Sequence, residues 1–133
     1  MRIADVLPLT PLQQGLLFHA SAALGGDDVY AVQLYVSLSG PLDAERLHAA
    51  VQAVVVRHPN LVARFSQQHA DPVQILLAEP VVPWQYVELD DEEQIAQLCA
   101  DERIAVCELG NRPAFRALLI RTGTDRYLSL IHI

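Results

Sequence analysis

Two hydrophobic periodicities alternate along this chain, and their order limits the folds that it can adopt. Apolar residues three or four positions apart predict helices, whereas apolar residues at every second position predict strands. The resulting order, α β α β β α β β with several hairpins, indicates an α+β fold rather than a doubly wound parallel sheet. We expect helices at residues 10–24, 43–58 and 90–109, strands at 30–38, 61–66, 73–78 and 115–121, and a last strand from Arg126.

The first helix has the sharpest predicted boundaries. Thr10 is a favourable N-cap, Pro11 suits the first helical position, and Gln13 stands three residues after Thr10. Thr10 and Gln13 are therefore predicted to form a capping box, in which each side chain bonds to the backbone N–H of the other residue. Gly25 and Gly26 are predicted to end the helix.

The other segments also carry boundary signals. Asp43 is predicted to cap the second helix, and Pro59 to end it, because the residue before a proline leaves the α region. The acidic run from Asp90 to Glu93 is predicted to form the first turn of the third helix, where carboxylates suit the helix dipole. Prolines interrupt residues 79–89, which we expect to be extended at a sheet edge. Alternation predicts that the strand at 30–38 buries one face, formed by Tyr30, Val32, Leu34, Val36 and Leu38.

The composition excludes several classes of protein. The chain has 133 residues, a hydrophobic fraction of 52% and a formal net charge of -7. This size and hydrophobic content suit one packed domain, or one lobe of a larger one. The acidic balance gives no electrostatic footprint for nucleic acid or for an anionic membrane. Residues 1–20 do not resemble a secretory signal, and the apolar runs are too short to span a bilayer, so we expect a cytoplasmic protein.

The cysteines and histidines do not form a recognisable catalytic or metal-binding pattern. Cys99 and Cys107 are eight residues apart in a predicted helix, and a rise of roughly 12 Å is beyond the reach of a disulfide. We expect them to be free thiols in the core rather than nucleophiles. The spacing of His48 and His58 does not suit a metal site, and His19 is expected to be a packed or partly exposed helix residue.

Other catalytic motifs are missing from the sequence. It contains neither a glycine-rich phosphate loop, nor a Gly-x-Ser-x-Gly turn, nor a His-Glu-x-x-His pair. Trp84, next to Pro83, could line a groove, but core packing is the default expectation for a tryptophan. The residue chemistry alone therefore predicts no more than an α+β domain.

Four stretches, in the right order, resemble the condensation domains of nonribosomal peptide synthetases. LPLTPLQQGLLFHA (residues 7–20) resembles the opening motif of that family, and RHPNLVARF (residues 57–65) resembles its second motif, commonly Arg-His-x-x-Leu-Arg-x-x-Phe. DVYAVQLYVSLSGPLD (residues 28–43) lies between the two motifs and resembles the family's first strand and the turn after it. FRALLIRTGTDRY (residues 115–127) resembles a later stretch, so the likeness runs from about Ile3 to Tyr127. The residues that match the two motifs are Thr10, Pro11, Gln13, Gly15 and His19, then Arg57, His58, Leu61 and Phe65, with Arg64 at a variable position of the second motif.

The resemblance implies a fold and a reaction. The fold would be the N-terminal lobe of a two-lobed structure similar to chloramphenicol acetyltransferase, with a mixed sheet and helices on one face. The family joins a donor acyl or peptidyl thioester to the amine of an acceptor aminoacyl thioester. Both substrates arrive on phosphopantetheine arms of carrier domains, so carrier domains, an adenylation domain and the second lobe are the implied partners, and the lobe itself would bind no cofactor or metal.

The catalytic motif that the resemblance implies is absent from the chain. The family's His-His-x-x-x-Asp-Gly should follow the strand that begins near Arg126, and its second histidine positions or deprotonates the attacking amine. The chain reads RYLSLIHI there, with His132 as its one histidine. We therefore assign no catalytic residue within it and expect the chain alone to be inactive.

The last six residues, Leu128 to Ile133, have a second interpretation. LSLIHI is the literal translation of CTGTCTCTTATACACATC, which resembles a transposon-derived sequencing adapter. We expect residues 1–127 to be part of a condensation domain and residues 128–133 to be a non-native tail.

Two positions depart from the family pattern. Val62 stands where the second motif usually has its second arginine, and Arg64, two residues on, is expected on the same face of a strand. Cys107-Glu108-Leu109 stands where Phe-Asp-Leu is usual. The opening helix is similar to that of members that take a D-configured donor residue.

Two other functions remain open from the sequence alone. One is an acyltransferase of the same fold that uses coenzyme A, and the other is a noncatalytic module that docks a carrier domain. Epimerisation and heterocyclisation domains share the fold, but the sequence Gln-Gly-Leu-Leu-Phe-His (residues 14–19) in the opening helix favours condensation.

Overall fold

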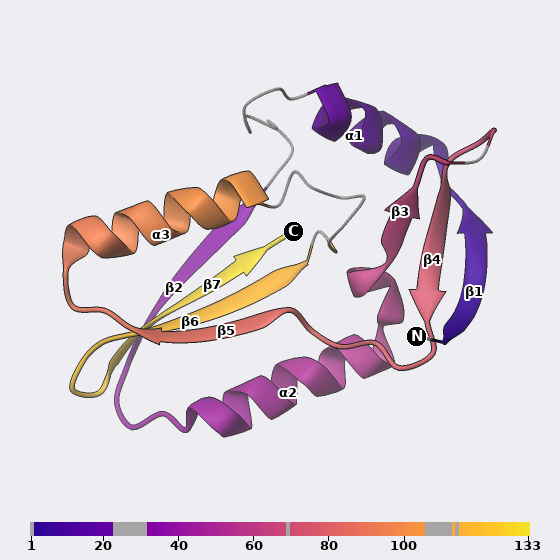
Figure 1. Ribbon diagram of the computed structural model, residues 1–133. Helices are drawn as coiled ribbons and strands as arrows, with labels where there is room; N and C mark the ends of the chain where they lie inside the picture. The colour runs from indigo at the N-terminus through magenta and orange to yellow at the C-terminus, as the bar shows by residue number, and fades with distance from the viewer. Residues whose placement is uncertain (1, 23–31, 69, 106–112, 114) are drawn as a thin grey trace.

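Two sheets and three helices make up the described part of the chain (Figure 1). The computed structural model describes residues 2–22, 32–68, 70–105, 113 and 115–133. One sheet has three antiparallel strands in the order β1-β4-β3, and the other has four strands in the order β2-β7-β6-β5. The elements are β1 (Ile3–Pro8), α1 (Pro11–Ala22), β2 (Gln33–Ser39), α2 (Ala44–Arg57), the 3-10 helix η1 (Pro59–Val62), β3 (Arg64–Ser66), β4 (Val73–Leu77), β5 (Trp84–Glu88), α3 (Glu92–Ala105), β6 (Arg116–Gly123) and β7 (Arg126–His132).

The four-stranded sheet is mixed, as predicted. β7 pairs antiparallel with β2 on one side and with β6 on the other, while β5 pairs parallel with β6. A parallel pair needs a crossover connection, and α3 supplies it between β5 and β6. The predicted edge position of residues 79–89 is confirmed, since β5 is the outer strand beside β6.

Helices cover both faces of this sheet, which corrects the expectation of helices on one face. Val55 of α2 packs in a core cluster with Ala117 of β6, whereas Cys99 of α3 packs with Leu118 of β6. Successive strand residues point to opposite faces, so α2 and α3 lie on opposite sides (Figure 1). The physical reason lies in β6, where four successive apolar residues, Ala117 to Ile120, are all buried. Successive residues face opposite sides of the sheet, so each side needs its own apolar cover.

The predicted helix starts are confirmed in their capping bonds. The backbone N of Thr10 donates to Gln13 Oε1 (2.9 Å), and the backbone N of Gln13 donates to Thr10 Oγ1 (3.2 Å). Asp43 Oδ1 accepts from the backbone N of Glu45 and Arg46 at the start of α2. The acidic run is placed slightly differently from the prediction: Asp91 precedes α3 and caps it, so only Glu92 and Glu93 lie in its first turn.

Two segments differ from the sequence-based expectation. β1 was not predicted at all, and the expected strand at 61–66 is the 3-10 helix η1 followed by the short β3. Pro59 explains this, because it occupies the first helical position and the backbone N of Leu61 then donates to the carbonyl of His58 (3.0 Å). The expected ends of the first and third helices, at residues 24–26 and 106–109, lie outside the described residues.

The strand expected at 30–38 forms as β2 (Gln33–Ser39), but its predicted burial is wrong. Leu34 and Val36, on the face expected to be buried, are 49% and 40% exposed. They lie on the face of the sheet that α2 covers elsewhere, since Leu34 pairs with Ile131, which packs against the α2 cluster. Periodicity thus predicted the strand correctly. Its burial was predicted wrongly because α2 packs over the neighbouring strands and does not reach β2.

Residues 128–133 lie almost wholly in β7, between β2 and β6. Leu130 is fully buried in the cluster under α3. Whether these six residues are native is a matter of the gene sequence and stays a prediction.

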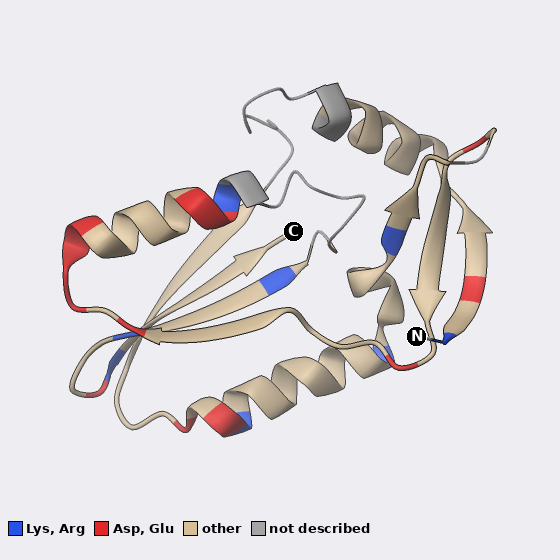
Figure 2. Cartoon of the chain, in the orientation of Figure 1, with Lys and Arg blue, Asp and Glu red and all other residues tan. Residues whose placement is uncertain are grey.

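The charged side chains concentrate at the ends of elements (Figure 2). Acidic residues mark the starts of α2 and α3, while Arg116 lies at the start of β6 inside the molecule. Among the described residues, no helix is both long enough and apolar enough to span a membrane.

Candidate functional site at the end of strand β7

Three polar side chains form a row across the sheet where β7 ends. Gln33 of β2 pairs with His132 of β7, and His132 pairs with Arg116 of β6, so the three stand at one level. Cross-strand partners project to the same face. Here that face is the one covered by α3, because Gln33 bonds to Cys99 and Arg116 bonds to Glu102. The register of three strands thus brings together residues that are far apart in the sequence.

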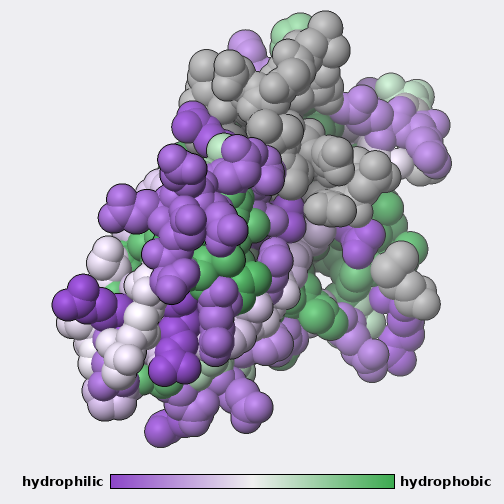
Figure 3. Space-filling view, turned by 60° about the vertical axis from the view of Figure 1, so that its left-hand side comes forward, coloured by the Kyte–Doolittle hydropathy of each residue, from purple (hydrophilic) through white to green (hydrophobic). Residues whose placement is uncertain are grey.

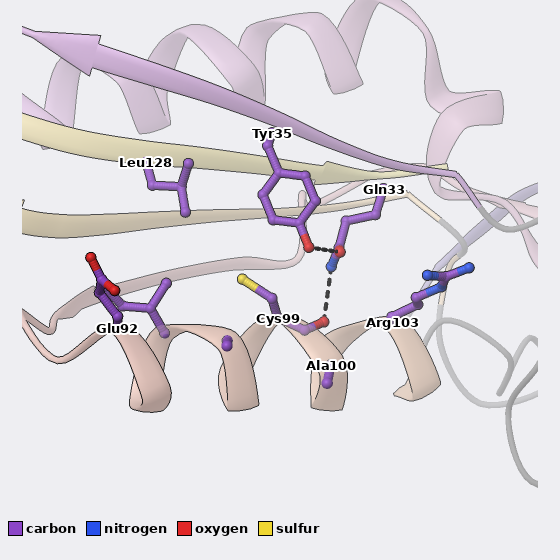
Figure 4. Close-up of a pocket in the computed structure, with 9 residues that line it drawn as sticks. Gln33, Tyr35, Glu92, Cys99, Ala100, Arg103 and Leu128 are labelled. Atoms are coloured by element: carbon purple, nitrogen blue, oxygen red, sulfur yellow. Dashed lines mark hydrogen bonds between the residues drawn. The ribbon is translucent and has the colours of Figure 1, made fainter.

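Gln33 connects β2, β7 and α3 (Figure 4). Its Nε2 donates to the carbonyl oxygen of Cys99 (2.9 Å), and its Oε1 accepts a short hydrogen bond from the Tyr35 hydroxyl. The same Nε2 lies within hydrogen-bond distance of His132 Nε2. Tyr35 stands two residues along β2 from Gln33, so both side chains leave the strand on one face.

Arg116 and Glu102 close the other side of the row. Arg116 Nη2 lies 3.0 Å from Glu102 Oε2, and the two side chains are only 15% and 13% exposed. His132 is 1% exposed, and its burial, followed by the positive charge of Arg116, lowers the pKa of its imidazole. The ring is therefore neutral at neutral pH.

A pocket of about 430 Å³ opens beside this row, between α3 and the outer strand β2. Its lining includes Gln33, Tyr35, Cys99 and Arg103, together with the apolar side chains of Ile95 and Leu128. The space-filling view of this side shows hydrophobic residues between hydrophilic ones (Figure 3). The pocket is thus an amphipathic hollow with one thiol, one phenol and one guanidinium on its rim.

The thiol in this pocket is not activated. Burial raises the pKa of Cys99, and burial also raises the pKa of Tyr35, followed by the influence of Cys99. A protonated thiol is a weak nucleophile, so a raised pKa does not suit Cys99 to nucleophilic attack. Cys99 is also buried and free, which confirms the prediction of a buried free thiol. Cys107 lies outside the described residues. This end of β7 therefore offers the neutral hydrogen-bonding groups of Gln33, Tyr35 and His132 beside the Arg116–Glu102 ion pair, and no activated thiol.

The opening motif fastens α1 to the three-stranded sheet. Gln13 Oε1, already bonded to Thr10, also accepts from Gln74 Nε2 (3.2 Å), which in turn donates to the carbonyl of Pro8 (3.2 Å). Gln74 is buried in β4, so the motif's glutamine satisfies a polar group in the sheet as well as a helix end.

The remaining residues of the opening motif lie along α1. Pro11 is its first residue, and Gly15 and His19 are exposed on it. The ring of His19 meets that of Phe18 edge to face at 5.7 Å. The lining of the pocket under α3 includes none of the motif residues.

The second motif is divided among three elements. Arg57 ends α2, His58 caps it, Leu61 in η1 packs against the α2 core cluster, and Phe65 lies in β3 beside Gln74. Val62 is buried in η1 whereas Arg64 is in β3. The expectation that Arg64 and position 62 share a strand face is therefore wrong, because Val62 is the last residue of the 3-10 helix and the strand begins only at Arg64, although both residues line one pocket.

The histidines do not gather into a metal site in the part of the chain that the structure describes, where no group of three His, Cys, Asp or Glu residues could hold an ion. His48 instead stacks flat on Trp84, with ring centroids 4.7 Å apart and planes inclined by 2°. Packing, the default expectation for Trp84, is confirmed.

The row at the end of β7 was missed by the sequence analysis. Gln33 was not singled out within the strand expected at 30–38, and His132 was noted only as a lone histidine. A signal existed in the alternation of β2 and β7, but the register that aligns them is a property of the assembled sheet.

Comparison with known proteins identifies the family. The family model described as "Condensation domain" matches residues 3–133. Among curated relatives, the chain is 29% identical to chondramide synthase cmdD of Chondromyces crocatus over 95% of the chain and 4% of that protein. It is 34% identical to N-(5-amino-5-carboxypentanoyl)-L-cysteinyl-D-valine synthase of Amycolatopsis lactamdurans over 87% of the chain and 3% of that protein. The chain thus spans only a few hundredths of the length of these relatives.

Solved structures show the same fold. The condensation domain of the monacolin K polyketide synthase MokA has a TM-score of 0.75 at 19% identity, over 99% of this chain and 30% of that one. A four-domain nonribosomal peptide synthetase, holo-AB3403, has a TM-score of 0.82 at 12% identity, over 99% of this chain and 10% of that one. The family match over nearly the whole chain, together with this shared fold, shows that the chain belongs to the condensation domain family.

Proposed function

We propose that this chain is the N-terminal lobe of a condensation domain that forms peptide bonds between carrier-bound substrates in a nonribosomal peptide synthetase. The family match over residues 3–133 carries the proposal, and the matched relatives include bacitracin synthase 3 and gramicidin S synthase 2. Carrier domains, an adenylation domain and a second lobe are the partners that this function requires. A cytoplasmic location is part of the proposal and is supported by the free thiol of Cys99.

The outer strand β2 supports the need for a second lobe. The chain covers 30% of the solved condensation domain of MokA and 32% of the first condensation domain of the calcium-dependent antibiotic synthetase. On β2, the apolar side chains of Leu34 and Val36 are exposed on a face that α2 covers over the neighbouring strands. Contiguous exposed apolar surface marks a contact with further protein.

In this function the lobe supplies structure and orientation rather than proton transfer. The family's histidine pair is expected where β7 ends, next to the row of Gln33, His132 and Arg116. The thioesters on their phosphopantetheine arms are substrates, and holding the amine near the thioester carbonyl would supply much of the rate acceleration. The chain alone carries neither the second histidine nor a second wall, so it should not accelerate the reaction.

The test compares the chain with the complete domain from the same gene. Each is mixed with a donor and an acceptor carrier domain loaded with aminoacyl thioesters, and dipeptidyl thioester is measured by mass spectrometry. The complete domain should form the product, and the chain alone should not. Product from the chain alone, or acylation by the complete domain from coenzyme A but not from carriers, would contradict the proposal.

Sequencing the source DNA past the codon for Tyr127 tests both the family motif and the tail. We expect an in-frame continuation into two histidines and an Asp-Gly, with residues other than Leu128 to Ile133 at some positions. A stop codon there would remove the enzyme interpretation, and genomic LSLIHI would refute the non-native tail.

A further inference from the structure

The amide of Gln33 has one orientation that satisfies its neighbours. Its Nε2 lies 2.9 Å from the carbonyl oxygen of Cys99, which can only accept a hydrogen bond, and its Oε1 accepts from Tyr35. Turning the amide over would set its oxygen against that carbonyl oxygen, two acceptors with no proton between them. The amide nitrogen must therefore be the atom that also faces His132.

This orientation determines where His132 carries its proton. An amide N–H can only donate, so ring Nε2 must accept from Gln33 and cannot itself be protonated. A neutral imidazole then holds its one proton on Nδ1. The imidazolium form would require a proton on Nε2, which Gln33 opposes. Burial of the ring and the nearby Arg116 oppose it as well.

The other ring nitrogen is left as a donor without an acceptor. Nδ1 is buried and has no hydrogen-bond partner among the described residues. Among the described residues, the titratable or charged groups that face the ring are Arg116 of β6 and, through Arg116, Glu102 of α3. Tyr35 of β2 acts through Gln33, and the Cys99 thiol of α3 interacts with Tyr35. None of these groups is an acceptor placed to take the Nδ1 proton.

We infer that Gln33 is a positioning residue that holds His132 as a neutral imidazole with its proton on Nδ1 at the end of β7. Tyr35 and the carbonyl of Cys99 anchor the amide from β2 and α3, so three elements set the state of one ring. The inference describes the chain with His132 as it stands in the sequence. Its catalytic meaning rests on the proposed function, which places the family's histidine pair where β7 ends, and on source DNA that encodes a histidine at position 132. A ring fixed in one tautomer gives that end a constant hydrogen-bond donor.

The experiment observes the ring nitrogens directly. In the 15N-labelled chain, long-range 1H–15N correlation spectra distinguish a protonated from an unprotonated imidazole nitrogen. His132 should show a protonated Nδ1 and a bare Nε2. In Gln33→Glu the carboxylate cannot donate, attracts a proton to Nε2, and should reverse the tautomer and raise the pKa of the ring. In Gln33→Leu the preference for one tautomer should be lost.

Two further variants control for charge and for folding. Gln85→Glu introduces the same charge at an exposed position of β5 in the same sheet and should leave His132 unchanged. Tyr35→Phe keeps the ring of Tyr35 and removes one of the two groups that orient the amide, so the preference for the Nδ1 tautomer should weaken while the Cys99 carbonyl still favours it. Circular dichroism checks the fold, and if Gln33→Glu does not fold, Gln33→Leu and Tyr35→Phe carry the test.

The inference is overturned if wild-type His132 is protonated at Nε2, or if its tautomer and pKa are the same in every folded Gln33 variant. Because the readout is the nitrogen signal of one ring, it does not depend on catalysis. A failure to form peptide bonds would leave this result standing, and the reverse also holds.

Discussion

The two outer strands of the four-stranded sheet, β5 and β2, are finished in different ways. β5 is held by α2 and ends in one charged residue, Glu88, whereas β2 presents apolar side chains to solvent. Both strands are edges of the same sheet, so both leave one row of backbone hydrogen-bonding groups unpaired within it. The difference is in what the rest of the chain provides for each edge.

Side chains of α2 fix the approach to β5. Gln52 Nε2 donates to the carbonyl of Pro80 (2.8 Å), and Gln52 Oε1 accepts from the backbone N of Val82 (2.9 Å). One helical turn earlier, His48 stacks on Trp84. The segment that joins the two sheets is therefore held along its length by one helix.

β2 has no comparable support on its outer side among the described residues. Its sequence, QLYVSLS, contains no charge and no proline, the two devices that usually prevent an edge strand from pairing with another chain. Natural edges without such protection are normally covered. Within this chain, α2 therefore supports the β5 edge, whereas the β2 edge stays open to contact with further protein.

The largest expected effect comes from breaking the support of β5. Gln52→Leu removes both bonds and leaves the buried Pro80 carbonyl and Val82 N–H unsatisfied, at about 1–3 kcal/mol for each group. The free energy of unfolding, measured by urea denaturation, should fall accordingly. Gln52→Glu keeps the acceptor for Val82 and should lose less. Equal stability of Gln52→Leu and wild type would show that the support is not needed.

A smaller loss is expected when the aromatic stack on β5 is removed. His48→Ala should lower the free energy of unfolding by about 0.5–1.5 kcal/mol, because the paired rings contribute that much beyond their buried area. Trp84 is the single tryptophan of the chain, so its fluorescence should change as well. His48→Phe should retain most of the stability, and an unchanged emission spectrum in His48→Ala would contradict the stack.

At β2, a charge should alter association more than stability. Val36→Lys at this exposed position should change the free energy of unfolding by less than about 0.5 kcal/mol. Sedimentation velocity should show concentration-dependent self-association of the wild-type chain, which the lysine reduces.

The matched control for this prediction is Gln85→Lys, on the exposed side of β5, which should not affect association. In the complete domain, Val36→Lys should instead be destabilising, because the strand is then covered. Equal effects of the two lysines, or a wild-type chain that stays monomeric throughout, would remove the distinction between the edges.

A small, salt-dependent effect is expected at the ion pair that ends β5. Glu88 Oε1 and Arg121 Nη1 are 3.7 Å apart, and their side chains are 64% and 41% exposed. Glu88→Gln should therefore lower the free energy of unfolding by less than about 1 kcal/mol. The difference from wild type should shrink as salt is added, and a difference that persists in high salt would show that the pair is not a surface contact.

The sequence predicted helix boundaries best where a side chain bonds to nearby backbone. Thr10 with Gln13, and Asp43, form their expected bonds because those bonds involve residues two or three positions apart. β1 was missed because its state depends on β4: its residues are mostly exposed, include Asp5, and are extended because they pair with Val73–Leu77. Propensity does not reveal a strand that its partner imposes.

The candidate site could be predicted only in part. The buried thiol of Cys99 follows from the helical spacing of Ile95, Leu98 and Cys99. The row of Gln33, His132 and Arg116 could not, because it requires the registers of β2, β7 and β6, and a slip of one residue would send each side chain to the other face.

The pairing of β2 with β7 has a consequence during synthesis. Gln33 and His132 are neighbours in the sheet although they are 99 positions apart in the chain. At roughly 5–20 residues per second, translation needs about 5–20 s to proceed from one to the other. For that interval the nascent chain carries an uncharged strand whose ladder partner has not been made. A ribosomal pause before β7 would therefore be more hazardous to this protein than a pause after it.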